Sequence, residues 1–208
     1  MDRGKFITLE GGEGVGKTSS LDYIADYLRG RGVALTVTRE PGGTTLGESL
    51  RTLVLSEREL SPEAELLMMF AARVQHVREV IVPSLAAGQW VLSDRFTDAS
   101  YAYQCGGRGI ATEVIEFLEK WTLGHLRPDL TLLLDAPVEI GIARIRARGA
   151  MDRFECEASE FQKRVRHTYR MRAEAFPERI HVIDASRSPG RVRADICAEL
   201  ERRFAHDF

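Results

Sequence analysis

The stretch Gly11-Gly12-Glu13-Gly14-Val15-Gly16-Lys17-Thr18 decides the fold of this chain. It follows Phe6-Ile7-Thr8-Leu9, a short run of β-favouring residues, and it precedes residues 17–31, whose apolar spacing is helical. Its glycines, lysine and threonine have the spacing of a phosphate-binding loop (P-loop), which requires a strand before it and a helix after it. Backbone N–H groups of such a loop converge on phosphate oxygens, and the helix N-terminus adds positive potential. The stretch therefore predicts a site for a nucleoside triphosphate.

The side chains of this loop have separate chemical tasks. Lys17 can reach the β- and γ-phosphates, and the Thr18 hydroxyl can ligate magnesium. We expect ATP to be bound by the whole loop, Gly11, Gly12, Glu13, Gly14, Val15, Gly16, Lys17 and Thr18. The motif alone leaves open kinases, GTPases, ATP-driven ligases and nucleotide-gated binding modules. The sequence has no Asn-Lys-x-Asp segment for reading guanine, which disfavours a GTPase and makes a kinase for a small acceptor the leading interpretation.

Further apolar runs predict the rest of a sheet. Strands are expected over residues 6–9, 33–38, 90–92, 130–134 and 180–183. Helical patterns lie between them, including 46–55 and 62–87, the latter with Ser61 as N-cap before Pro62. Strands that alternate with helices imply parallel pairing and ligands beyond the carboxyl ends of the strands. We expect an α/β, P-loop NTPase fold, a five-stranded parallel sheet with helices on both faces, in a single domain over 1–208.

Composition narrows the class of partner and the location. Lys and Arg total 29 against 31 Asp and Glu, so a net charge of −2 gives no reason to expect nucleic acid or a membrane surface as a partner. Cys105, Cys156 and Cys197 are far apart, which suggests neither a disulfide framework nor a zinc site. No apolar run reaches the roughly 18 residues of a membrane span, and residues 1–5 are charged rather than typical of a signal peptide. We therefore expect a cytoplasmic location.

Four segments beyond the P-loop resemble the thymidylate kinase family, in family order. They are Thr38-Arg39-Glu40-Pro41-Gly42-Gly43-Thr44, Ala71-Ala72-Arg73-Val74-Gln75, Ser93-Asp94-Arg95-Phe96, and Tyr101-Ala102-Tyr103-Gln104 with Gly106-Gly107-Arg108-Gly109. With the arginine-rich stretch at 144–153, the resemblance covers nearly the whole chain. It implies an ATP:dTMP phosphotransferase that uses Mg²⁺ and produces dTDP and ADP for dTTP biosynthesis. It also implies a homodimer.

The resemblance assigns the acceptor phosphate to three arginines. A phosphate dianion needs planar cations, and the candidates are Arg39, Arg51 and Arg95. Arg39 and Arg95 each follow a predicted strand, where the ligands of such a sheet bind. Asp94 lies at the end of the strand that Arg95 follows. It is expected to hold magnesium together with Thr18, or to position the acceptor.

The resemblance likewise assigns the nucleoside. Arg73 and Gln104 are expected at the polar groups of thymine, with Ser100 in the same pocket. Glu13 is expected at the sugar 3′-hydroxyl, and Tyr103 where its ring excludes a 2′-hydroxyl. Family members often carry a stacking Phe four residues before this arginine, but this chain has Met69 there and Phe70 beside it. Neighbouring helical residues point about 100° apart, so the two cannot both face the base equally. Phe70 is the candidate, and Met69 remains the alternative.

An arginine-rich lid is expected over about 144–156. Family members carry a catalytic arginine either in the P-loop or in a mobile lid, and this P-loop offers only Glu13, Gly14 and Val15 between its glycines. The catalytic cation should therefore come from Arg148, Arg153 or both, acting with Lys17 and Asp94. A kinase for another nucleoside monophosphate or a small alcohol, or a nucleotide-switched binding module, remains the alternative.

Overall fold

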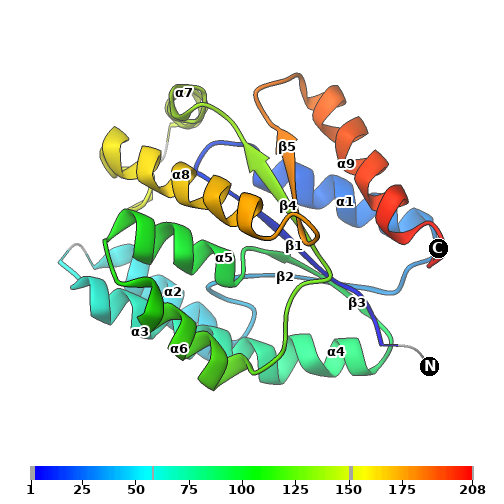
Figure 1. Ribbon diagram of the computed structural model, residues 1–208, viewed down its shortest axis with the longest axis horizontal. Coiled ribbons are helices and arrows are strands. Elements are labelled where there is room, and N and C mark those ends of the chain that lie inside the picture. The colour runs from blue at the N-terminus through cyan, green and yellow to red at the C-terminus, as the bar shows by residue number, and fades with distance from the viewer. Residues whose placement is uncertain (1–2, 58, 150–151, 208) are drawn as a thin grey trace.

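Buried apolar strands form the centre of the molecule, as the sequence predicts. The structure, a computed structural model, describes residues 3–57, 59–149 and 152–207. Within these residues, five parallel strands form a sheet in the order β2-β3-β1-β4-β5 (Figure 1). The strands are β1 Phe6–Gly11, β2 Leu35–Arg39, β3 Trp90–Asp94, β4 Leu130–Asp135 and β5 Ile180–Asp184. The predicted α/β fold with a five-stranded parallel sheet is confirmed.

Helices cover both faces of this sheet (Figure 1). The α-helices are α1 Lys17–Gly30, α2 Thr45–Ser56, α3 Pro62–His76, α4 Val82–Ala86, α5 Thr97–Ser100, α6 Thr112–Leu123, α7 Val138–Arg148, α8 Ser159–Ala175 and α9 Pro189–Phe204. Two π-helical segments, η1 Val77–Ile81 and η2 Tyr101–Gly107, continue α3 and α5. None of the described helices is long and apolar enough to cross a lipid bilayer.

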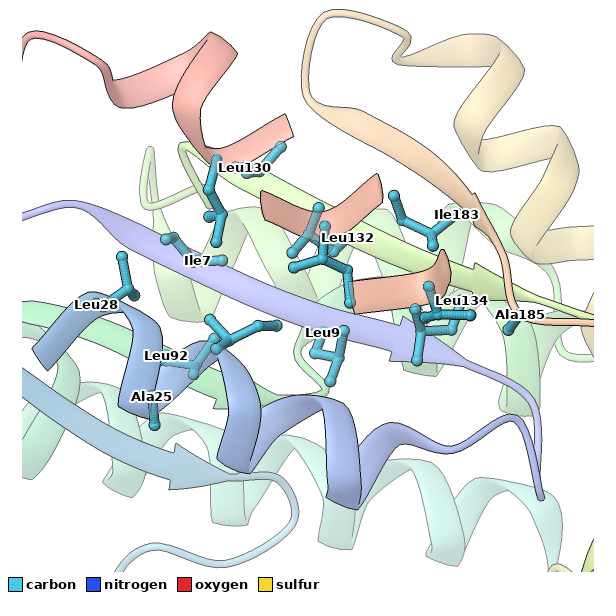
Figure 2. Packing of buried hydrophobic residues seen from close by; sticks show 14 of the residues in the cluster. Ile7, Leu9, Ala25, Leu28, Leu92, Leu130, Leu132, Leu134, Ile183 and Ala185 are labelled. Atoms are coloured by element: carbon cyan, nitrogen blue, oxygen red, sulfur yellow. The ribbon is translucent and has the colours of Figure 1, made fainter. Parts of the chain in front are cut away.

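Alternation along the strands distributes side chains between the two faces. Ile7, Leu9, Leu132 and Leu134 pack with α1 and α9 on one face, as Figure 2 shows for the α1 side. Phe6 and Val91 point to the opposite face, against η1 and α4, and Leu133 lies there with α8 and η2. Because both faces are covered, the three central strands β1, β3 and β4 are buried along nearly their whole length, whereas the edge strands β2 and β5 are partly exposed.

Most predicted boundaries shift by one or two residues, and two differences have an identifiable physical cause. β2 begins at Leu35 and not at residue 33, because the Val33 amide donates to Leu28 O and thereby belongs to the turn that ends α1. The helix predicted over 62–87 runs from Pro62 to Ala86 but contains the π-helical η1. Pro83 follows η1, has no amide hydrogen and would crowd the carbonyl four residues earlier, so wider turns before it relieve the conflict. Ser61 caps α3 as predicted, accepting from Ala64 N at 3.2 Å.

Two glycines let the loop after β1 lie directly against α7. Gly14 has a φ of 70°, and a Cβ added there would come within 2.2 Å of Gly141 O. A Cβ at Gly141 would in turn come within 2.4 Å of Glu13 O. Since these neighbours are backbone atoms, they cannot move aside without displacing the loop.

We expect Gly141→Ala to destabilise the protein, although alanine favours helices over glycine. The clash with Glu13 O should lower the free energy of unfolding by about 1–3 kcal/mol, measured by urea denaturation followed by circular dichroism. Gly190→Ala in α9 is the matched control, since no atom lies within 4 Å of the added methyl group. That variant should be neutral or stabilised, and equal shifts for both variants would contradict the proposed close approach.

Candidate active site

A cavity of about 880 Å³ opens at the carboxyl end of the sheet. Its walls come from the loops after β1 and β2, the start of α1, the end of β3, and from α2, α3, α5, η2, α7 and residues 152–155. The size is typical of pockets for nucleotide-sized ligands. Of the predicted site residues, it brings together Glu13, Gly14, Gly16, Lys17, Thr18, Arg51, Arg73, Asp94, Arg95, Ser100, Tyr103, Gln104 and Arg148.

The P-loop forms one end of this cavity. The Lys17 ammonium donates to Gly11 O at 3.1 Å and to Gly12 O at 2.7 Å, which curls the loop around it. Burial, and next the charge of Arg95, lower the pKa of Lys17. Gly11, Gly12 and Val15 do not line the cavity, and Val15 packs into the hydrophobic core beneath the loop. They shape the loop through the backbone.

A buried cluster around Arg95 joins the P-loop to η2. The Arg95 guanidinium donates to Glu13 Oε1 at 2.6 Å, Tyr103 OH at 3.0 Å and Tyr169 OH at 3.1 Å. Burial alone would raise the pKa of Glu13, but Arg95 and Lys17 outweigh it and lower the pKa to about 2. Glu13 is therefore an anion throughout the neutral range.

A second carboxyl group, that of Glu10, lies beside this cluster, and its pKa is shifted in the opposite direction from that of Glu13. It accepts from Phe96 N and Tyr169 OH, both at 2.7 Å. Burial, and next the negative charge of Asp98, raise its pKa to about 8. Glu10 is thus mostly neutral near pH 7, which leaves Arg95 to pair with Glu13.

Asp94 supplies the carboxylate expected of a magnesium site. It ends β3 and lines the cavity together with Thr18. Its Oδ1 is buried without a hydrogen-bond partner among the described residues, and such an oxygen suits a hydrated cation. No group of three or more His, Cys, Asp or Glu side chains in the described part of the chain could hold a metal alone. Mg²⁺ at nucleotides needs only one or two protein oxygens besides phosphates and water, so the residues fit.

The opposite end of the cavity is polar and held rigidly. Arg73 donates to Glu40 Oε2 at 2.6 Å, Ser100 Oγ at 2.9 Å and Phe96 O at 3.0 Å. Glu40 also contacts His76 at 3.0 Å, so its buried charge is well partnered. The Gln104 amide donates to Glu65 at 2.9 Å.

Phe70 is not among the residues that the structure brings to the cavity. It is 3% exposed and packs with Leu66 and Tyr101 in a core cluster. Its neighbour Met69 lines the cavity, which follows from the turn of about 100° between successive helical residues. Arg73 nevertheless reaches the Phe70 ring, with its guanidinium carbon 4.8 Å from the ring centre.

The candidate phosphate ligands separate into two groups. Arg51 lines the cavity beside Arg95 and donates to Pro41 O at 3.1 Å. Arg39 does not line it, because its guanidinium is half-exposed and paired with Glu48 at 2.7 Å. A nearby carboxylate on α2 thus competes for Arg39.

The lid arginines are also divided. Arg148, the last residue of α7, lines the cavity and pairs with Glu155. Arg153 does not line it and instead donates to Glu65 Oε2 at 2.8 Å and Val54 O at 3.3 Å. Residues 150 and 151 of the predicted lid lie outside the described residues.

Sequence reasoning missed the two buried carboxylates that orient the site, Glu40 and Glu65. A signal for Glu65 exists, since Glu65, Met69 and Arg73 follow one another at spacings of four and therefore share one face of α3. Glu40, between Arg39 and Pro41, lies outside a helix, so no helical spacing relates it to the other site residues.

Comparison with known proteins gives a consistent answer. The family model for thymidylate kinase matches residues 9–196. A thymidylate kinase of Methylococcus capsulatus is 55% identical over 205 residues, 99% of each chain, and one of Methylobacillus flagellatus is 55% identical over 97% of this chain and 98% of its own. The crystal structure of thymidylate kinase from Ehrlichia chaffeensis superposes with a TM-score of 0.79 at 34% identity, over 96% of this chain and 99% of that one. The chain therefore belongs to the thymidylate kinase family, whose members are nucleoside-monophosphate kinases.

Proposed function

We propose that the chain, as one kinase domain over 1–208, transfers the γ-phosphoryl group of ATP to dTMP, giving dTDP and ADP for dTTP biosynthesis. One observation carries this proposal. The P-loop at one end and the Arg73, Ser100 and Gln104 side chains at the other face a single cavity. A donor and an acceptor nucleotide held there would be oriented for direct transfer, which lowers the barrier by positioning alone.

ATP would be bound by the P-loop backbone and Lys17, with Mg²⁺ held by Thr18, Asp94 and the phosphates. The buried Asp94 Oδ1, which has no hydrogen-bond partner among the described residues, supports this assignment. When bound, Mg²⁺ would neutralise phosphate charge and help to orient the phosphoryl group.

The acceptor would place its phosphate at Arg95 and Arg51. Both guanidinium groups line the cavity, whereas Arg39 could contribute only by leaving Glu48. The thymine would meet Arg73, Ser100 and Gln104 with Met69 against one face, and the sugar would lie at Glu13 and Tyr103. Each of these polar groups is already fixed by a protein partner, as pre-organised binding requires.

Charge on the transferring group would be stabilised chiefly by Arg148. Phosphoryl transfer passes through a loose transition state with charge on the equatorial oxygens, and a nearby guanidinium opposes that charge. Arg148 lines the cavity, while Arg153 is engaged by Glu65. Closure of the lid would also exclude water and thereby suppress ATP hydrolysis.

We further propose a cytoplasmic homodimer. Helix α6 exposes Phe117 and Trp121, whose rings stack at 6.2 Å, and Val114 lies one turn before them. An exposed aromatic pair of this kind is typical of a protein interface. The described cysteines are free thiols, as in a reducing compartment. Sedimentation equilibrium tests the dimer, since a particle of the 23.3 kDa chain mass would exclude it.

An acceptor panel tests the reaction itself. We expect the rate of ADP release with dTMP to exceed the rate with AMP, dGMP or no acceptor by at least about 10²-fold. It should exceed the rate with dUMP only modestly, because the single methyl group that distinguishes the two bases contributes about 1–3 kcal/mol. Lys17→Met should lower kcat with dTMP by about 10²-fold or more and leave the free energy of unfolding nearly unchanged. Lys163→Met, on the exposed side of α8, is the control. Equal rates with every acceptor would exclude a thymidylate-specific kinase.

Tyr103 should exclude ribose by its ring and organise Arg95 by its hydroxyl. Tyr103→Ala should lower the preference for dTMP over its ribose counterpart by about tenfold or more, measured as the ratio of kcat/KM values. Tyr103→Phe keeps the ring but removes the bonds to Glu13 and Arg95, so that variant should retain the preference while KM for dTMP rises. An unchanged ratio in Tyr103→Ala would refute the steric role.

Arg148→Ala should lower kcat by roughly 10²-fold or more with little change in dTMP affinity, because its contact would form mainly in the transition state. Arg153→Ala should cost less in kcat and instead lower the free energy of unfolding, since it removes a partner of the buried Glu65. Arg146→Ala, an exposed position of α7, is the control. Steady-state kinetics together with calorimetric dTMP binding distinguish these roles. A kcat within a few-fold of the parent value in the Arg148/Arg153 double variant would show that the lid arginines do not contribute to catalysis.

A further inference from the structure

Glu65 of α3 is a fully buried carboxylate that does not itself line the cavity. Among the described residues, three side chains donate to it, Gln104 Nε2 at 2.9 Å, Arg153 Nη1 at 2.8 Å and Arg108 Nε at 3.2 Å. Burying a carboxylate is costly unless cations and hydrogen bonds compensate it, and the two arginines supply that compensation. The amide of Gln104 is not needed for charge balance, so its contact calls for another explanation.

Of the three donors, only Gln104 lines the cavity. A glutamine amide has a donor end and an acceptor end of nearly the same shape, and by itself it can turn over to suit either kind of ligand. A carboxylate can only accept, so Glu65 fixes the Nε2 end toward itself. The carbonyl oxygen of Gln104 is then the end that remains for a ligand.

This direction matches one class of pyrimidine. Thymine and uracil carry an N–H at ring position 3, which a carbonyl oxygen accepts, whereas cytosine carries a lone pair there, which a carbonyl oxygen repels. Arg73, fixed in the same manner by Glu40, offers only donors and suits a ring carbonyl rather than the amino group of cytosine.

We propose that Glu65 is a positioning residue that locks the Gln104 amide with its oxygen toward the acceptor base, and so selects pyrimidines with N3–H against cytosine. This inference rests on the proposed placement of the dTMP base at Gln104. The Glu65 side chain touches no substrate and acts only through Gln104.

The substitution Glu65→Gln should reverse the orientation of the Gln104 amide. The carbonyl oxygen of the new amide would accept from Arg108 and Arg153, which turns its NH₂ group toward Gln104. Gln104 must then accept with its own oxygen and present Nε2 to the base, where it suits cytosine. Arg73 is unaffected, so selectivity should fall without being lost.

The test compares dTMP and dCMP as acceptors by kcat/KM, with dCMP also measured as a competitive inhibitor of dTMP turnover. In Glu65→Gln the dTMP/dCMP selectivity should fall about tenfold or more. Arg108→Met is the matched control, because it removes another partner of the same carboxylate but leaves the Gln104 contact, so its selectivity should stay within about twofold of the parent. The double variant Glu65→Gln/Arg108→Met removes one anion and one cation together. It should show the same loss of dTMP/dCMP selectivity as Glu65→Gln. If the single variant is too unstable to assay, the double variant tests whether Glu65 orients the Gln104 amide.

Gln104→Ala separates this inference from the proposed site. If it raises KM for dTMP while Glu65→Gln and the double variant keep the parental selectivity, Glu65 does not orient the amide and the inference is wrong. If Gln104→Ala changes neither KM nor selectivity, the base does not lie at Gln104 and both proposals are overturned. A parallel loss of activity on dTMP and dCMP in Glu65→Gln would also refute the inference, because that is what a purely structural role predicts.

Discussion

The burial of one cation, the guanidinium of Arg95, organises the carboxyl edge of the sheet. A buried cation without partners would cost several kcal/mol, so groups from distant parts of the chain must converge on it. Glu13 comes from the P-loop, Tyr103 from η2 and Tyr169 from α8, and Gly11 O closes the shell. Arg95 itself has a φ of 70°, a conformation that a non-glycine residue adopts only where its surroundings enforce it. The P-loop, η2 and α8, the helix after the expected lid, are thereby fixed to one another.

The same solution recurs at the other end of the cavity. Arg73 and Gln104 would be flexible if solvated, and each is held by a buried glutamate, Glu40 and Glu65 respectively. Fixing polar side chains before a ligand arrives removes an entropic cost from binding. It also determines which atoms face the ligand, and this matters more for an amide than for a guanidinium because an amide can present either a donor or an acceptor.

Patterns that depend on local geometry were predictable from sequence. Strands covered on both faces give apolar runs, and the P-loop spacing is fixed by the loop itself, so the sheet and the position of Lys17 followed directly. Pairing between side chains was not predictable, because it depends on which charged group lies nearest in space. Arg39 pairs with Glu48 and Arg153 with Glu65, although Arg39 follows a strand and Arg153 lies in the expected lid, where ligand contacts were predicted. The choice between Met69 and Phe70 could not be made from the sequence for a related reason, since only the packing of α3 decides which side of the helix faces the cavity.

The position of β1 in the sheet has a consequence for biosynthesis. β1 is made first but pairs only with later strands, Phe6 opposite Val91 and Ile7 opposite Leu130. While the ribosome is still making the middle of the chain, this apolar strand has no neighbour to complete its hydrogen bonds, and non-local parallel pairing of this kind is slow. The nascent chain therefore exposes an unpaired strand edge until β4 emerges. During this period the edge could bind a chaperone or form non-native pairs.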